Sequence, residues 1–164
     1  MIRRALLFAA LFAVPQLIWQ ALRGTAVERA LVHDGTVRCA VFLINLLTPQ
    51  VHASAVGATV SAPGGGVRIV NGCDGTEAWF LLFAAFAVAP LGWNSRCRGF
   101  LLGTAVVFTV NQLRILALFY AVRADRGLFD LLHSTVTPIA VILLVAGYFY
   151  AWVAHDTPRV ATAV

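Results

Sequence analysis

Three residues that are far apart in the chain have the side-chain types of a thiol-based catalytic site: Cys73, Arg114 and His133. Acyl transfer by a thiol needs an attacking thiolate, a group that carries protons, and a cation for the oxyanion that develops on the attacked carbonyl. A cysteine, a histidine and an arginine can supply these three functions. Each residue taken alone also has an ordinary structural explanation, so the surrounding segments decide between the two.

Cys73 lies in the segment Gly72-Cys-Asp-Gly-Thr-Glu77, directly before an apolar run. Asp74, followed by Glu77 three residues later, resembles a capping box and predicts a helix that starts at the next glycine. A thiol just before this helix feels unpaired backbone amides and the positive end of the helix dipole, which favour the thiolate. The alternatives are a buried cysteine in a tight turn and a disulfide with Cys39.

Arg114 lies within the apolar stretch 99–122, which is long enough to cross a bilayer. Burying a guanidinium group there costs about 2.5–3.5 kcal/mol on membrane-insertion scales. That cost indicates a function, and Asn111, three residues earlier, shares the same helix face. The alternatives are an arginine that reaches out to the lipid head groups and one that is neutralised by Glu77 from the neighbouring helix.

His133 comes just before the last apolar segment. Ser134 or Thr137 can cap the helix that follows, and Pro138 suits its first turn. Neither the cysteines nor the other histidines (His33, His52 and His155) have the spacing along the chain that is typical of metal ligands. Neither a metal nor another cofactor is therefore expected.

The composition is that of a membrane protein. Of the 164 residues, 60% are hydrophobic and only 12% are charged, and the charges cluster between apolar runs. Soluble helices need one polar face, which these runs lack. The sequence predicts an all-α polytopic membrane protein that forms one integral membrane domain over residues 1–164. The expected spans are about 5–22, 76–91, 99–122 and 136–154.

The arginines predict the orientation. The net charge of +5 comes from twelve arginines and no lysine, and the arginines flank apolar segments. They therefore indicate membrane orientation and lipid contact rather than nucleic-acid binding. Arg3 and Arg4 precede the first span, which is predicted to be an uncleaved signal anchor. Arg96 and Arg98 indicate that the loop 92–98 is cytoplasmic. In a plasma (inner) membrane, the loops before the second and fourth spans then face the periplasm or the cell exterior.

The long outer loop, residues 23–75, has two expected elements. Residues 39–51 are apolar but too short to span, and Pro49 interrupts them. This pattern predicts an interfacial helix or a segment that dips into the membrane and returns. Residues 58–71 alternate around a Pro-Gly-Gly-Gly turn, which predicts a β-hairpin that leads to Cys73. All three candidate residues then lie toward the outer membrane face.

At these residues the chain resembles the exosortase/archaeosortase family of membrane-embedded cysteine transpeptidases. The matching pieces are Gly72-Cys-Asp-Gly-Thr-Glu-Ala78, Asn111-Gln-Leu-Arg-Ile-Leu-Ala-Leu-Phe-Tyr120 and Leu132-His-Ser134. The likeness is strong over about residues 67–153 and weaker over 31–66. Many members of the family have more spans, so this chain would be a compact form.

The resemblance implies a cysteine peptidase or transpeptidase. Its implied nucleophile is Cys73, with Arg114 and His133 completing the site and with Asp74, Glu77 and Asn111 in support. The implied substrates are exported proteins that carry a short C-terminal sorting motif, a membrane helix and an arginine-rich tail.

Two other classes of protein stay open. A four-helix, quinone-coupled thiol oxidoreductase needs cysteine pairs on the outer face, where only Cys39 and Cys73 are available and no CxxC motif occurs. A non-enzymatic membrane subunit would use Arg114, paired with Glu77, to join helices. That explanation leaves the Gly-Cys-Asp-Gly turn and His133 without a role.

Overall fold

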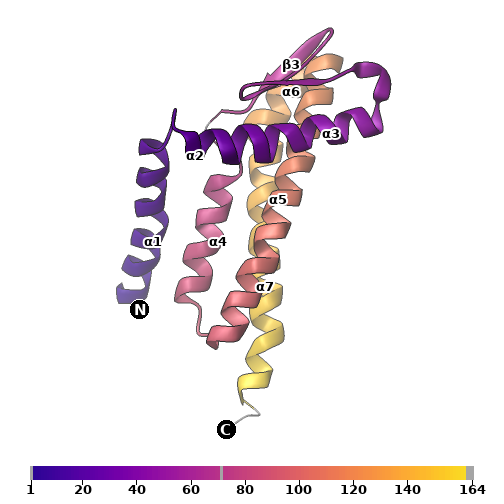
Figure 1. Ribbon diagram of the computed structural model, residues 1–164. Coiled ribbons are helices and arrows are strands. Elements are labelled where there is room, and N and C mark those ends of the chain that lie inside the picture. The colour runs from indigo at the N-terminus through magenta and orange to yellow at the C-terminus, as the bar shows by residue number, and fades with distance from the viewer. Residues whose placement is uncertain (1, 71, 162–164) are drawn as a thin grey trace. The chain divides into compact units, whose positions relative to one another are not determined.

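The computed structural model describes residues 2–70 and 72–161, and the chain is mostly helical (Figure 1). The helical elements are α1 (Ile2–Ala21), α2 (Ala26–Glu28), η1 (Arg29–Val37), α3 (Arg38–Leu47), η2 (Pro49–Val51), α4 (Thr76–Val88), α5 (Trp93–Ala124), α6 (Arg126–Leu131), η3 (Leu132–Val136) and α7 (Thr137–Ala161). The strands are β1 (Ser54–Val56), β2 (Thr59–Ala62) and β3 (Gly65–Arg68). Helices long and apolar enough to cross a membrane are Ile2–Ala21, Ala26–Leu47, Trp93–Ala124 and Arg126–Asp156. The predicted fold class, an all-α polytopic membrane protein, is confirmed.

The expected second span, 76–91, is wrong at its end. Helix α4 has 13 residues and stops at Val88, so it is about 20 Å long, shorter than the hydrocarbon core of about 30 Å. Pro90 explains the stop, because the residue before a proline is forced out of the helical conformation, and Ala89 is extended. The expected loop 92–98 is also wrong, since α5 already starts at Trp93.

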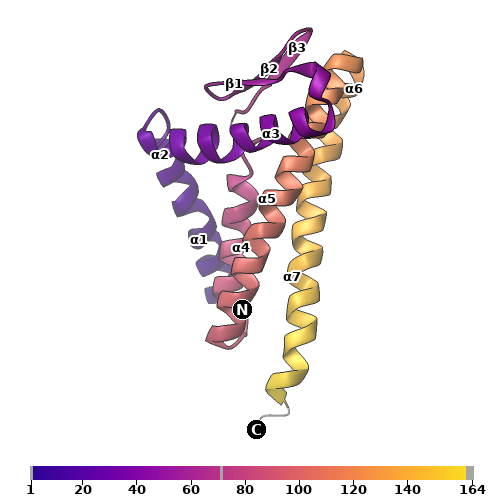
Figure 2. The same ribbon diagram turned by 45° about the vertical axis from the view of Figure 1, so that its right-hand side comes forward.

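A longer helix than expected precedes the sheet. The apolar segment was expected to begin at residue 39, whereas α2, η1 and α3 form one helix over Ala26–Leu47. Charged residues hid its first half in the sequence, although Asp34 and Arg38 fit the helix as an ion pair four residues apart (3.1 Å). Both views show this helix crossing the Thr109–Ala124 part of α5 (Figures 1 and 2). Its interfacial position stays a prediction.

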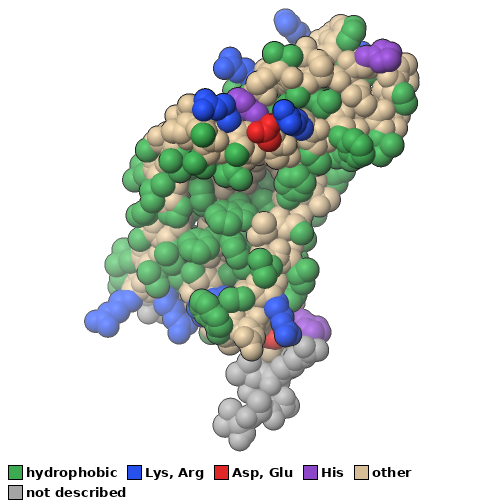
Figure 3. Space-filling view, in the orientation of Figure 1, with side chains coloured by type: hydrophobic (Ala, Val, Ile, Leu, Met, Phe, Trp, Pro, Cys, Tyr) green, Lys and Arg blue, Asp and Glu red, His purple; other side chains and the backbone are tan. Residues whose placement is uncertain are grey.

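The chain forms two compact units, and unit 1 comprises α1, residues Gly75–Phe108 and α7 from Val141 onward. In unit 1, α1 packs on α4. Gly99 lets α4 and α7 approach α5, because a Cβ atom there would lie 2.6 Å from both Phe86 and Trp152. The Tyr148 hydroxyl donates to the Gly99 carbonyl at 2.7 Å. Figure 3 shows a largely hydrophobic surface over this unit, with arginine side chains where α1 begins.

Unit 2 comprises residues Leu22–Asp74 and Thr109–Ala140, and it contains the sheet. The expected hairpin is confirmed: β2 and β3 pair antiparallel, with Ala62 opposite Gly65 across a two-residue turn. β1 adds a third strand that the sequence did not reveal. The buried Val60 and Val67 face each other in the core of the sheet. Asn71, the last residue of the expected hairpin segment, lies outside the described residues.

Candidate active site

A tight turn between β3 and α4 presents Cys73. Gly72 and Gly75 both adopt left-handed backbone angles (φ 79° and 83°), which glycine tolerates and other residues rarely adopt. Within the turn the Cys73 N–H donates to the Val70 carbonyl at 2.9 Å, and the residue is only 3% exposed. The N-cap position of α4 falls on Gly75, so the expected cap at Asp74 is wrong by one residue.

Arg114 reaches this turn from α5. Its Nη1 donates to the Gly72 carbonyl at 2.5 Å, and its Nη2 donates to the Cys73 Sγ at 3.6 Å. Its Nε donates to the Thr137 hydroxyl at 3.0 Å. In the described part of the chain, no ion pair includes Arg114. The predicted alternative, neutralisation by Glu77, therefore has no support in these contacts, and Glu77 is exposed in the first turn of α4.

His133 brings an imidazole to the same sulfur. Its Nδ1 lies 3.7 Å from the Cys73 Sγ, and its ring stacks on Phe129 at 5.4 Å with an interplanar angle of 5°. As expected, His133 precedes the last apolar helix, since α7 starts at Thr137. The expected cap at Ser134 or Thr137 is wrong, because η3 is a π-helical turn inside a helix that runs over Arg126–Asp156. Pro138 accounts for the wide turn, since it lacks an N–H group and its ring clashes with the carbonyl one turn back.

Thr137 joins the arginine to the turn that carries the histidine. Its hydroxyl accepts from Arg114 Nε and donates to the Leu132 carbonyl at 2.9 Å. Its backbone N–H also donates to Leu132, which closes the π-helical turn. Thr137 is buried, so one hydroxyl group helps to orient both the guanidinium and the segment that holds the imidazole.

Asp74 faces a different arginine. Its Oδ2 accepts from Arg23 Nη2 at 2.9 Å, and its side chain is 1% exposed. Arg23 also contacts Glu28 through Nη1 at 3.0 Å. The segment that follows α1 is thereby tied to the cysteine turn, 51 residues further along the chain.

Asn111 is buried at 3% exposure on the helix that carries Arg114. Its Oδ1 has no hydrogen-bond partner among the described residues, and the same is true of Oε1 of the neighbouring Gln112. A buried amide oxygen without a partner costs about 1–3 kcal/mol. These two oxygens are the acceptors that this part of α5 leaves open, and Asn111 shares the helix face of Arg114.

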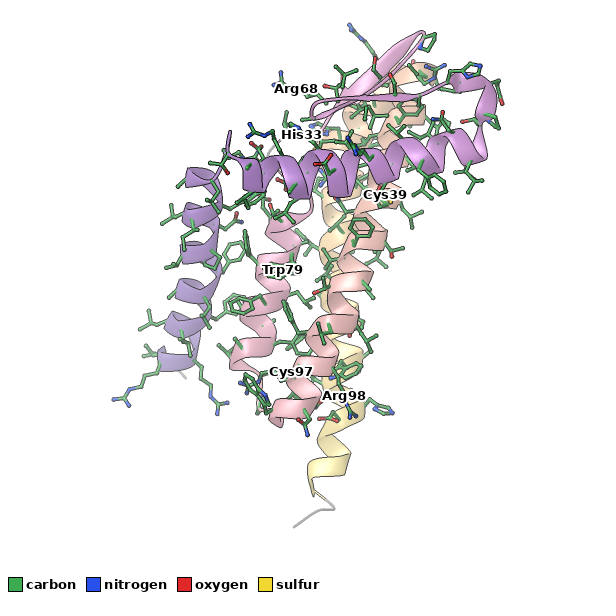
Figure 4. All side chains as sticks on the ribbon, in the orientation of Figure 1. His33, Cys39, Arg68, Trp79, Cys97 and Arg98 are labelled. Atoms are coloured by element: carbon green, nitrogen blue, oxygen red, sulfur yellow. The ribbon has the colours of Figure 1, made fainter. Side chains whose placement is uncertain are left out.

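The remaining cysteines are separate from this cluster. Cys39 is a free thiol on α3, so the disulfide that the sequence left open between Cys39 and Cys73 is not formed. Cys97 is a free thiol near the start of α5, next to Arg98 (Figure 4). Among the described residues, no group of three or more histidine, cysteine or acidic side chains could hold a metal ion.

The structure thus brings Cys73, Arg114 and His133 together within unit 2, as predicted from their positions along the chain. One sulfur atom has an imidazole nitrogen and a guanidinium nitrogen as neighbours. This arrangement can stabilise a thiolate, because no carboxylate among the described residues pairs with the cation and the imidazole can take or return the thiol proton. The catalytic roles themselves stay predictions.

Sequence reasoning missed Arg23 and Thr137 as parts of the site. Arg23 is an arginine near the end of an apolar run, and its partner Asp74 is too distant in sequence to give a local signal. Thr137 was recognised only as a possible helix cap. Its place directly before Pro138 was the available signal, because a proline that follows several helical residues indicates an irregular turn there.

Comparisons of the chain with protein-family models, with curated proteins and with solved structures gave no significant match.

Proposed function

We propose that the protein is a membrane cysteine peptidase or transpeptidase of the exosortase/archaeosortase kind, which cleaves C-terminal sorting signals of exported proteins. The observation that carries the proposal is the double contact of the Cys73 sulfur, with His133 Nδ1 at 3.7 Å and Arg114 Nη2 at 3.6 Å. Nucleophile, proton carrier and cation meet at one atom, as acyl transfer requires.

The first half-reaction forms a thioester. The Cys73 thiolate attacks the carbonyl carbon of the scissile peptide bond, a C–S bond forms, and the carbonyl oxygen becomes an oxyanion. Each terminal nitrogen of Arg114 has a second N–H group that can donate to this oxyanion. When the C–N bond breaks, the imidazolium of His133 gives its proton to the leaving amine.

The second half-reaction releases the product. Water or an amine of an acceptor molecule attacks the thioester and gives a proton to the neutral imidazole of His133. The C–S bond breaks and the thiolate of Cys73 is restored next to Arg114. The open Oδ1 acceptor of Asn111 lies on the helix face of Arg114 and could receive an N–H group of the bound substrate.

A membrane location of the site supports a membrane-anchored substrate. Cys73 lies three residues before the start of α4, whereas Arg114 lies inside α5, which is long and apolar enough to span. A substrate with its own membrane helix would bring its scissile bond to this depth. The sorting motif, the membrane helix and the basic tail of the substrate follow from the family resemblance.

Replacement of the thiol tests the proposal. Cys73→Ala should abolish processing of a co-expressed exported protein that bears such a C-terminal signal, whereas Cys39→Ser and Cys97→Ser should retain it. A hydroxylamine-sensitive adduct between the substrate fragment and Cys73, detected by mass spectrometry, would support acyl transfer. Normal processing by Cys73→Ala contradicts the proposal, and equal loss in Cys39→Ser favours a redox pair instead.

The proposal places the site on the periplasmic or exterior side of a plasma (inner) membrane. In intact cells, Cys97 should then resist a membrane-impermeant maleimide, because Arg96 and Arg98 hold that end of α5 in the cytoplasm. Labelling after membrane permeabilisation is the control. Efficient labelling of Cys97 in intact cells would place the site on the cytoplasmic side.

A further inference from the structure

The residue next to the candidate nucleophile carries a buried negative charge. The Asp74 side chain is 1% exposed and directly follows Cys73 in the turn. A carboxylate beside a thiol disfavours the thiolate, because like charges repel strongly where water is excluded. Thiol chemistry at Cys73 is therefore easier when the charge of Asp74 is balanced.

Arg23 is placed to balance it. Its guanidinium donates to the Asp74 carboxylate through Nη2 at 2.9 Å and to Glu28 through Nη1 at 3.0 Å. The second oxygen of Glu28 accepts the backbone N–H of Gly24 at 2.6 Å. The planar guanidinium is held on two sides in this way, and an arginine keeps its charge at any physiological pH.

The groups around the thiol then divide into two sets. Arg114 and His133, from α5 and η3, contact the sulfur itself. Arg23 forms an ion pair with Asp74, the residue after the thiol, and Glu28 is bound to that arginine. With Asp74 neutralised by Arg23, the attraction of Arg114 for a thiolate is not opposed by the neighbouring carboxylate.

We propose that Arg23 acts through Asp74 to keep Cys73 reactive, by offsetting the negative charge of the carboxylate that follows the thiol. The inference deepens the proposed function, because it rests on Cys73 as the nucleophile. It predicts that removing the arginine slows thiol chemistry and that removing the carboxylate as well restores it.

The test measures alkylation of Cys73 by iodoacetamide at neutral pH. The full-length protein is purified in detergent with Cys39→Ser and Cys97→Ser, so that Cys73 is the one thiol. Arg23→Gln should slow alkylation about tenfold or more, since an unbalanced charge close to a thiol shifts its ionisation by an amount of this order. The double variant Arg23→Gln/Asp74→Asn should return close to the starting rate.

Arg38→Gln is the matched control. Arg38 also pairs with an aspartate, Asp34, but both side chains are largely exposed (72% and 56%), and the variant should leave the alkylation rate unchanged. Labelling after denaturation gives the total thiol content of every variant.

Three results would overturn the inference. Arg23→Gln could be alkylated as fast as the parent protein, the double variant could be as slow as Arg23→Gln, or Asp74→Asn alone could be alkylated more slowly than the parent protein. The Asp74→Asn variant also tests the inference if Arg23→Gln fails to fold. A charge effect predicts that its Cys73 is alkylated at least as fast as that of the parent protein. Alkylation needs no substrate. Failure of this inference therefore stays distinct from failure of the proposed function, which normal processing by Cys73→Ala would reveal.

Discussion

The two units of the chain use polar side chains in different ways. In unit 1, side-chain hydrogen bonds join neighbouring helices at separate points: Trp79 donates to the Thr104 hydroxyl at 3.0 Å, and Tyr148 donates to the carbonyl of Gly99. In unit 2, charged and polar groups from separate segments gather around the one sulfur of Cys73. In a membrane protein, convergence of several such groups on a reactive atom indicates chemistry better than the presence of a polar residue does.

One arginine from each unit illustrates the difference. Arg96 in unit 1 donates through Nη2 to the carbonyl of Ala89 at 2.9 Å, just beyond the end of α4, and to that of Leu91 at 3.4 Å. The Ala89 carbonyl also accepts the backbone N–H of Leu91 at 2.9 Å, so the arginine stabilises the turn that follows the helix. Arg114 in unit 2 binds a carbonyl, a hydroxyl and a thiol together. The same side chain is therefore expected to be replaceable in unit 1 and irreplaceable in unit 2.

The largest effect is expected from the proton carrier. His133→Ala should lower the rate of substrate processing about 10²–10⁴-fold, which is the usual contribution of a general acid–base group, without lowering the amount of protein in the membrane. His155→Ala is the control from unit 1, where this histidine is exposed on α7. Normal processing by His133→Ala would leave a site of Cys73 and Arg114 alone, and would weaken the contrast between the units.

A conservative change of the site arginine should have the next largest effect. Arg114→Lys should reduce processing about 10²–10³-fold, because an ammonium group cannot reproduce the planar fork that binds three partners. The protein should still insert correctly, as judged by its abundance in membranes. Arg96→Lys is the matched control, since a lysine can still donate to one carbonyl. Equal activity of the two variants would return Arg114 to a structural role.

The sequence was most informative where local chemistry is repeated or extreme. Apolar runs predicted the fold class, and the Pro-Gly turn predicted the hairpin. The buried arginine, the turn around Cys73 and the histidine before the last apolar segment predicted the candidate site. Boundaries were less predictable. Pro90 ended α4 three residues earlier than expected, and the charged residues Asp34 and Arg38 masked the first half of the helix over Ala26–Leu47.

The ion pair that flanks the cysteine was not predictable. Arg23 and Asp74 are 51 residues apart, and no periodicity links them. The π-helical turn at His133 was also missed, because its hydrogen bonds depend on Pro138 and on the Thr137 hydroxyl together. Such features depend on which segments pack together, which a single sequence does not reveal.

A smaller effect is expected from the residue that orients the site. Thr137→Val keeps the side-chain shape but removes the hydroxyl group that binds Arg114 and Leu132. Losing such a buried partner costs about 1–3 kcal/mol, so kcat should fall about tenfold to a hundredfold while KM changes little. Thr137→Ser restores the hydroxyl and should recover activity.

Thr104→Val provides the unit 1 counterpart to Thr137→Val. Thr104 accepts a hydrogen bond from Trp79, so its loss should affect stability and leave kcat unchanged. A loss of kcat in Thr104→Val equal to that in Thr137→Val would mean that the second substitution acts through general loosening of the helices.

The smallest effect on processing is expected where unit 1 is most closely packed. A Cβ atom at Gly99 would lie 2.6 Å from both Phe86 and Trp152, whose rings cannot move aside easily, so Gly99→Ala should destabilise the fold by roughly 1–3 kcal/mol. The activity of each folded molecule should be unchanged. Gly147→Ala is the matched control: nothing lies within 4 Å of the added atom, and alanine in a helix should stabilise by about 0.5–1 kcal/mol. Thermal unfolding in detergent, followed alongside processing per folded protein, gives both quantities. Loss of processing in Gly99→Ala at an unchanged melting temperature would show that unit 1 takes part in the reaction and would remove the distinction between the two units.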